Sequence, residues 1–128
     1  MAQLGDTFLL ANPGINSHLF VIISDPAADP EHLVIASFTS WRADKDQSCV
    51  VEAGEHPFAK KRSCVYYGQD RLMTLGQYEA CLASASITPH QPVTGELLDR
   101  VLDGAAISPH LPLGSREILA VQGLIDPE

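Results

Sequence analysis

The part of the chain richest in reactive side chains is residues 55–71, with the sequence EHPFAKKRSCVYYGQDR. It contains four of the eight Lys and Arg residues, one histidine and three of the seven Phe and Tyr residues. Cationic side chains bind anionic ligands, and histidine can transfer protons near neutral pH because its ordinary pKa is about 6.5. The stretch is typical either of a site for an anionic ligand or of a solvated loop that leads into a strand.

The distribution of charge favours the first interpretation. Residues 42–71 carry six basic and five acidic side chains, a net charge of +1, whereas the other 98 residues carry two basic and eleven acidic ones, a net charge of −9. The total of −8 argues against a protein that coats nucleic acid by bulk charge, but it permits a local cationic site.

Length and cysteine usage indicate a single domain, spanning residues 1–128, in a reducing compartment. A chain of 128 residues is long enough to bury a core without disulfide or metal staples. The three cysteines are widely spaced and form no CxxC pair, so we expect buried thiols, Cys64 included, and no metal site or cofactor. The N-terminal MAQLGDTF lacks the features of a signal peptide, and no apolar run approaches the roughly 18 residues that span a bilayer. We therefore expect a soluble cytoplasmic protein with no membrane partner.

Short apolar runs separated by turn residues predict the strands. They cover residues 7–11, 18–24, 32–39, 48–52 and 62–67, and a sixth short strand is plausible at 71–75. The first three should form an antiparallel meander, because their connections are too short for a crossover helix. Alternation in the fifth strand places Tyr66 and Tyr67 on opposite faces, so one of them should belong to the core. Short strands with tight links predict a small barrel or a curled sheet.

Helical patterns occupy the last third of the chain. Residues 78–85 predict a short helix that ends before Pro89. Thr94 is the expected N-cap of a second helix over residues 95–102, and Gly104 should close it. Ser115 is the expected cap of a final helix at residues 116–122. Helices after a run of strands give an α+β, mainly β fold, in which a helical tail at 76–128 packs on a barrel at 5–75.

The order of these elements resembles the MazF/PemK-like toxins of toxin-antitoxin systems. The matching pieces are Gly5-Asp6, the runs HLFVIISDP and HLVIASFTS, and SCVYYGQDRL followed by a helical tail. The resemblance covers roughly residues 5–75. It implies a small SH3-like β-barrel of five to six strands with C-terminal helices, which cuts single-stranded RNA without a metal. It also implies a homodimer and a protein antitoxin whose acidic segment would occupy the cationic groove.

The chain departs from the family pattern at its reactive positions. The family's strongest catalytic arginine falls on His18, and the proline after it falls on Leu19. An Arg and an Asp expected near the fifth strand fall on Tyr66 and Gly68, with an acid only at Asp70. The chain is therefore either a divergent branch with a rebuilt site or a fold that has lost the activity.

RNA cleavage of the family's kind needs a base, an acid and cations for the developing phosphate charge. The residues that the resemblance and their chemistry make catalytic candidates are His18, Thr39 and His56. The candidates for binding phosphate or stacking on unpaired bases are Ser40, Trp41, Lys60, Lys61, Arg62, Tyr66 and Asp70. Each catalytic candidate has a structural alternative. His18 could be a rim residue satisfied by water, His56 a loop residue, and Thr39 the partner of a backbone group at a sheet edge.

Two functions follow from this set of residues. The first is a metal-independent endoribonuclease that acts on single-stranded RNA. The second is a catalytically inert barrel that binds a protein or nucleic-acid partner. The missing Arg and Asp favour the second, whereas the clustered bases and histidines favour the first.

Overall fold

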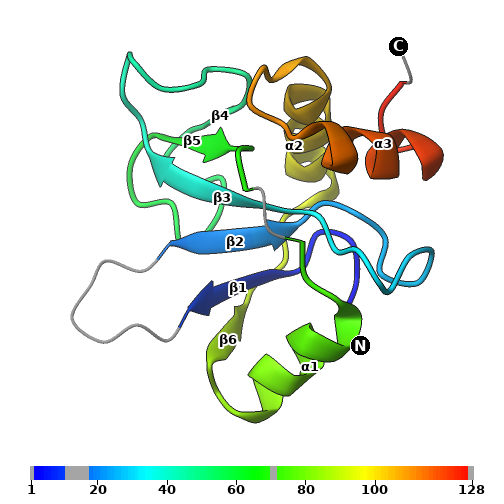
Figure 1. The fold of residues 1–128 in the computed structure, drawn as a ribbon. Helices are drawn as coiled ribbons and strands as arrows, with labels where there is room; N and C mark the ends of the chain where they lie inside the picture. Colours follow the sequence, from blue (N-terminus) through cyan, green and yellow to red (C-terminus); the bar gives the residue numbers. More distant parts are fainter. Residues whose placement is uncertain (1, 11–17, 70–71, 127–128) are drawn as a thin grey trace.

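The computed structural model describes residues 2–10, 18–69 and 72–126, and in them one antiparallel sheet is flanked by helices (Figure 1). The strands are β1 (Thr7–Leu10), β2 (Leu19–Ile22), β3 (Ile35–Ser40), β4 (Val50–Val51), β5 (Ser63–Tyr66) and β6 (Ile87–His90). Their spatial order is β4-β5-β3-β2-β1-β6. The helices are α1 (Leu75–Ala83), α2 (Gly95–Ile107) and α3 (Leu113–Val121). The predicted α+β class and the meander of the first three strands are confirmed.

The described strands form an open sheet with β4 and β6 as its two edges. The sheet is not confined to residues 5–75, because β6 comes from the predicted helical tail and pairs with β1 along its length. None of the helices in the described ranges is both long and apolar enough to cross a membrane.

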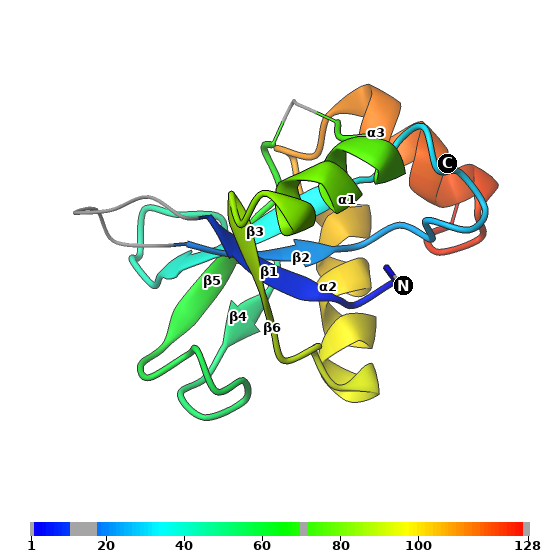
Figure 2. The same ribbon diagram turned by 90° about the horizontal axis from the view of Figure 1, so that it is seen from below.

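Alternating side chains divide the apolar residues between the two faces of the sheet. Leu19 and Val21 point to one face, where α2 and α3 cover them, and Phe20 and Ile22 point to the other, where α1 lies. Figure 2 shows α1 on one side of the sheet and α2 on the other. The arrangement follows from the period of two in a strand, which lets each strand supply both faces.

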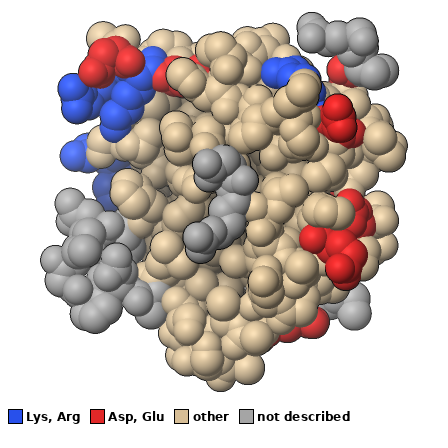
Figure 3. All heavy atoms as spheres, in the orientation of Figure 1, with Lys and Arg blue, Asp and Glu red and all other residues tan. Residues whose placement is uncertain are grey.

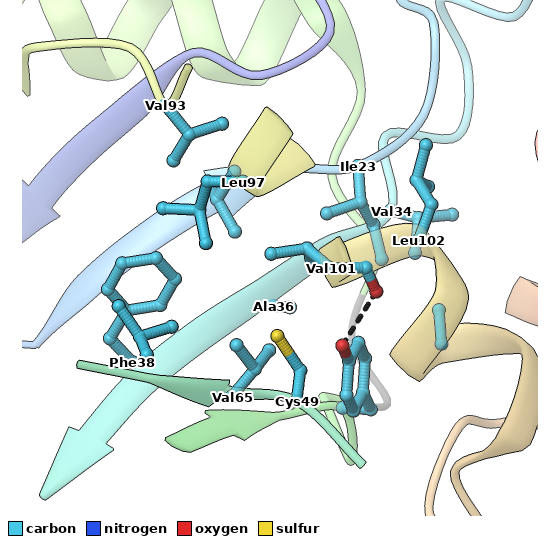
Figure 4. Close-up of a cluster of buried hydrophobic side chains, with 14 of the residues drawn as sticks. Ile23, Val34, Ala36, Phe38, Cys49, Val65, Val93, Leu97, Val101 and Leu102 are labelled. Carbon is cyan, nitrogen blue, oxygen red and sulfur yellow. Dashed lines mark hydrogen bonds between the residues drawn. The ribbon is translucent and has the colours of Figure 1, made fainter. Parts of the chain in front are cut away.

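The larger core lies between α2 and the sheet (Figure 4). Leu97 and Val101 of α2 point toward Ala36, Phe38 and Val65 of the strands. Tyr67, the buried one of the two adjacent tyrosines, donates its hydroxyl to the carbonyl of Val101 at 2.6 Å. Burial raises the pKa of Tyr67, so the phenol remains a donor to this carbonyl.

The sixth strand is not where the sequence pattern placed it. Arg71 and the predicted binding residue Asp70 lie outside the described residues, and the helix α1 already begins at Leu75. Between them, Met73 makes only an isolated bridge with Leu33. The observed sixth strand, β6, contains Pro89, which is tolerated because β6 is an edge strand and needs no ladder hydrogen bond on its outer side.

Three predicted helix ends are wrong: the start of α1, the end of α2 and the start of α3. The helix α1 begins at Leu75, three residues before the predicted start, because Thr74 and Gln77 form a capping box there. Thr94 caps α2 as expected, accepting from the N–H of Leu97 at 3.1 Å, but the helix continues past Gly104 to Ile107. Gly104 is buried, and its missing side chain lets α2 approach the sheet closely. The last helix begins at Leu113 after Pro112, so Ser115 lies inside it and is buried instead of capping it.

Candidate functional site

The helix α1 covers only part of its face of the sheet, and the uncovered part forms a cavity. Tyr78 of α1 packs on Phe8 and so covers the β1 side. The β2, β3 and β5 side carries an open cavity of about 460 Å³. Its lining residues are His18, Phe20, Ser37, Thr39, Asp44, Lys45, Asp46, Cys64, Val65, Tyr66, Gln69 and His110. The cavity therefore gathers three of the predicted site residues, namely His18, Thr39 and Tyr66.

Strand register explains why these side chains meet. Phe20 pairs with Ser37, and Ser37 pairs with Tyr66, so the three side chains form one row across β2, β3 and β5. Thr39 and Cys64 form the next row on the same face. His18 immediately precedes β2 and shares the orientation of Phe20 two residues later. The floor of the cavity is thus built from directly paired strands.

Tyr66 is half-exposed at this face and turns back over its own strand. Its hydroxyl donates to the carbonyl of Gly68 at 3.3 Å. A Cβ at Gly68 would lie 2.4 Å from that hydroxyl, so only glycine permits this orientation of the ring. Gly68 therefore makes room for the aromatic ring of Tyr66.

Lys45 supplies the positive charge of the cavity, and it comes from the connection between β3 and β4. Its ammonium donates to the hydroxyl of Thr39 at 2.7 Å and to the carbonyl of Ser40 at 2.9 Å. Thr39 is therefore held by a cation, and a phosphate oxygen that reached the hydroxyl would also meet the ammonium. Figure 3 shows Lys and Arg side chains gathered over this connection, at the upper left.

Asp46 joins the two segments that form the rim of the cavity. Its carboxylate accepts the N–H of Ser48 at 2.9 Å and the hydroxyls of Ser48 and Ser108. The hydroxyl of Ser108 in turn accepts the N–H of His110 at 3.1 Å. Burial raises the pKa of Asp46, whereas the hydrogen bonds from Ser108 and Ser48 and the nearby His110 lower it. The lowering effects are together the larger, so the pKa of Asp46 lies below its ordinary value. The network brings His110 beside a carboxylate that is ionised at neutral pH.

Cys64 contributes a neutral thiol to the cavity wall. Burial raises its pKa, more than the positive charge of Lys45 lowers it. A protonated thiol is a poor nucleophile, in agreement with the expectation that this cysteine is a buried structural residue.

His56 belongs to the connection between β4 and β5, and its side chain is buried outside the cavity. Its Nε2 donates to the carbonyl of Gln91 at 2.6 Å, and its Nδ1 accepts the N–H of Phe58 at 3.0 Å. Burial lowers its pKa, and the neighbouring His90 lowers it as well. Both ring nitrogens are occupied and His56 does not line the cavity, so its geometry describes a structural role.

The other predicted binding residues that the structure describes do not line the cavity. Ser40 and Lys60 and Lys61 are exposed, and Trp41 follows directly after β3. The guanidinium of Arg62 lies 5.2 Å from the centre of the Trp41 ring and binds Glu52 at 3.0 Å. Trp41 also donates its ring N–H to Gln47 at 2.7 Å. Trp41 and Arg62 thus form a stacked pair at the end of β3, next to Thr39 and Ser40.

Sequence reasoning missed Lys45, Asp46 and His110. Lys45 and Asp46 follow Thr39 and Ser40 closely, so their position in a charged connection was a usable signal. No local signal identifies His110, which reaches the rim only because the turn after α2 is tied to Asp46. Within residues 2–10, 18–69 and 72–126, no three His, Cys, Asp or Glu side chains are grouped as metal ligands.

Comparisons of the chain with protein-family models, with curated proteins and with solved structures returned no match. The geometry of the cavity therefore carries the functional argument.

Proposed function

We propose that the protein is a metal-independent endoribonuclease that acts on single-stranded RNA, with the cavity on β2, β3 and β5 as its site. One observation carries the proposal. Two imidazoles, His18 and His110, line the same cavity as the ammonium of Lys45. Two groups that can exchange protons and one fixed cation are the minimum set for cleaving a phosphodiester without a metal.

The reaction assigns one proton transfer to each histidine. One imidazole takes the proton of the ribose 2′-hydroxyl, whose oxygen then attacks phosphorus. The bond from phosphorus to the 5′-oxygen breaks, and the other imidazole, protonated at the start, gives its proton to that oxygen. The products are a 2′,3′-cyclic phosphate and a 5′-hydroxyl. Lys45 and the hydroxyl of Thr39, which are 2.7 Å apart, stabilise the charge that develops on the phosphate.

The aromatic side chains favour a single strand as the substrate. Tyr66 is 43% exposed on the cavity face and offers its ring to an unpaired base. Trp41 and Arg62 form a second stacking surface beyond Ser40. A duplex would present phosphates without free base faces, so these rings would gain nothing from it.

The resemblance to the MazF/PemK-like toxins adds finer elements to the proposal. They are an SH3-like barrel as the parent architecture of the open sheet, a homodimer, a protein antitoxin and a cytoplasmic location. The match of the apolar strands and the preserved Thr39 support this relationship. The site itself would be rebuilt, with His18 at the position of the family's strongest catalytic Arg and Tyr66 at the position of its second Arg.

Cleavage of a labelled RNA oligonucleotide in the presence of EDTA tests the activity. We expect products that end in a 2′,3′-cyclic phosphate. His18→Ala and His110→Ala should each slow cleavage by about 10²–10⁴-fold, and Lys45→Met by about 10²-fold or more. His32→Ala, which removes an exposed histidine outside the cavity, is the matched control and should retain full activity.

Two outcomes would contradict the assignment. Cleavage that survives in a His18→Ala, His110→Ala double variant would remove the cavity from the mechanism. A folded His56→Gln variant that loses cleavage would make His56 catalytic despite its two occupied nitrogens.

The alternative function, binding without catalysis, is favoured by the acidic part of the rim. Asp44 and Asp46 both line the cavity and repel a phosphate, although Arg42 pairs with Asp44 at 3.0 Å. If this alternative holds, the protein should release no product from an RNA oligonucleotide, and any binding to it should be no tighter than binding to its 2′-deoxy analogue. Expression of the chain without a partner should then leave growth unaffected.

A further inference from the structure

A second cleft lies between α3 and the connection from β2 to β3. It has a volume of about 610 Å³, and we call it the α3 groove. Asp29 and His32 line it from the connection, Glu117, Ile118 and Val121 from α3, and Leu72 also lines it. Gln122 fixes its two walls, because its side-chain oxygen accepts the N–H of Asp25 at 2.7 Å. The groove is therefore a built feature of the fold.

The α3 wall exposes apolar side chains to solvent. Val121 is 88% exposed, and Ile118 beside it in the groove is partly exposed. Leu113, at the start of the same helix, is 72% exposed but does not line the groove. The opposite side of α3 is satisfied, since Leu119 is fully buried in the core. A helix that already packs one face on the core has no structural need for apolar residues on the other, so the exposed ones are available to a partner.

The rim of the groove is acidic. Asp29 and Glu117 lie on opposite walls, and the carboxylate of Asp29 contacts Nδ1 of His32 at 3.0 Å. Among the described residues that line the groove none is Lys or Arg. Arg116, which directly precedes Glu117, donates to the carbonyls of Ala106 and Ser108, and Arg71, which precedes Leu72, lies outside the described residues. Figure 3 shows acidic side chains over α3 and over the β2–β3 connection. Most of the basic side chains on this face gather at the upper left, and a smaller basic group lies at the upper right near α3.

This charge pattern distinguishes between occupants. A second copy related by a two-fold axis would bring the two acidic rims together, because such an interface presents the same patch from both sides. Like charges in apposition oppose that contact. An occupant with apolar side chains flanked by Lys or Arg would satisfy both the apolar wall and the rim.

From these observations we infer that the α3 groove binds a basic, amphipathic peptide segment of a partner protein. The apolar side chains of the segment contact Val121 and Ile118, and its basic side chains pair with Asp29 and Glu117. The inference is independent of the proposed ribonuclease activity, because the residues that line the groove and those that line the cavity do not overlap.

Fluorescence anisotropy with synthetic peptides tests the groove. The probe is a labelled peptide of roughly 12 residues with Leu on one helical face and Lys on the other, about 18 Å long as a helix. Two peptides of equal length, one with Glu for Lys and one with Ser for Leu, serve as comparisons. We expect the Leu/Lys peptide to bind at least about tenfold more tightly than either, with an affinity that falls as salt rises.

Variants locate the binding. Val121→Asp should weaken the Leu/Lys peptide about tenfold, because it puts a desolvated charge against the apolar face, and Glu117→Lys should weaken it about fivefold. Ile107→Asp and Glu79→Lys make the same changes at exposed positions outside the groove and should leave the affinity within about twofold. RNA cleavage should be unchanged in all four variants.

Several results would overturn the inference. They are failure of the Leu/Lys peptide to bind, equal binding of the Leu/Glu peptide, and binding that Val121→Asp and Glu117→Lys leave intact. A dimer that sedimentation detects in the native chain and that Val121→Asp dissociates would assign the groove to a second copy instead.

Discussion

Replacing Gly104 by alanine tests the close contact between α2 and the sheet. A Cβ at this position would lie 2.4 Å from the hydroxyl of Tyr67, 2.9 Å from the Cβ of Cys49 and 2.9 Å from the carbonyl oxygen of Ser48. None of these atoms can move aside freely. The Tyr67 hydroxyl is bound to Val101, and the other two belong to the backbone or are directly attached to it. The helix must therefore shift outward.

The size of the effect follows from two opposing terms. Overpacking of a well-packed core costs about 1–3 kcal/mol, and three contacts at or below 2.9 Å place Gly104→Ala at the upper end. Alanine gains about 1 kcal/mol over glycine in a helix interior. The free energy of unfolding should thus fall by about 2 kcal/mol, which for a chain of this size lowers the Tm by roughly 8 °C.

Urea unfolding followed by circular dichroism measures this change. Gly95→Ala in the same helix is the control, because a Cβ there meets no atom within 4 Å, and it should be neutral or stabilise by a few tenths of a kcal/mol, roughly. Tyr67→Phe removes the nearest clashing atom. The Gly104→Ala, Tyr67→Phe double variant should therefore be about 1 kcal/mol more stable than the two single effects predict when they are added. A Gly104→Ala protein as stable as the native chain would show that α2 does not lie this close to the sheet.

Two further predictions concern a helix end and a buried histidine. Ala85 has a φ of 60° in the turn that ends α1, where the N–H of Ser86 donates to the carbonyl of Cys81, and α3 ends in a similar turn with glycine at position 123. Ala85→Gly should therefore stabilise the fold by about 1 kcal/mol, and Gly123→Ala should destabilise it by a similar amount. Thermal unfolding in which both variants shift the Tm in the same direction would contradict the reasoning. Burial lowers the pKa of His56, so as the pH falls the unfolded chain is protonated at this histidine before the folded chain is. The contribution of neutral His56 to the free energy of unfolding is therefore complete above a pH of about 6.5 and is lost as the pH falls below it. Urea unfolding between pH about 7.5 and 5.5 should show this loss, and His56→Asn should flatten the slope; an unchanged slope would refute it.

Much of the fold was predictable because it depends on local patterns. The first five strands lie where short apolar runs predicted them, and Tyr66 and Tyr67 point to opposite faces as their alternation requires. Thr94 caps α2, because an N-cap needs only a hydroxyl and the backbone N–H three residues later. The edge strand β6 was missed, because Pro89 is a strand breaker everywhere except at an edge, and edges exist only in the assembled sheet.

The candidate site was predictable only in part, and for the same reason. His18 and Thr39 meet on β2 and β3, which pair as the predicted meander requires. Tyr66 joins them through the pairing of β5 with β3, which the sequence pattern did not predict. His56 has the same chemistry as His18, yet it is buried with both nitrogens bonded to backbone groups. Nothing in the residues around it distinguishes a loop histidine in solvent from one closed in by residues 35 positions away.

The sequence by itself determined the first five strands, the presence of helices in the last third and the segregation of charge, since these follow from backbone preferences and composition over a few residues. Tertiary structure alone decided which side chains share a cavity. His110 joins Lys45 at the rim through the bonds from Ser108 to Asp46, 62 positions apart in the chain. Such a contact depends on how α2 packs on the sheet, down to the missing Cβ of Gly104, and no local pattern of residues records that packing.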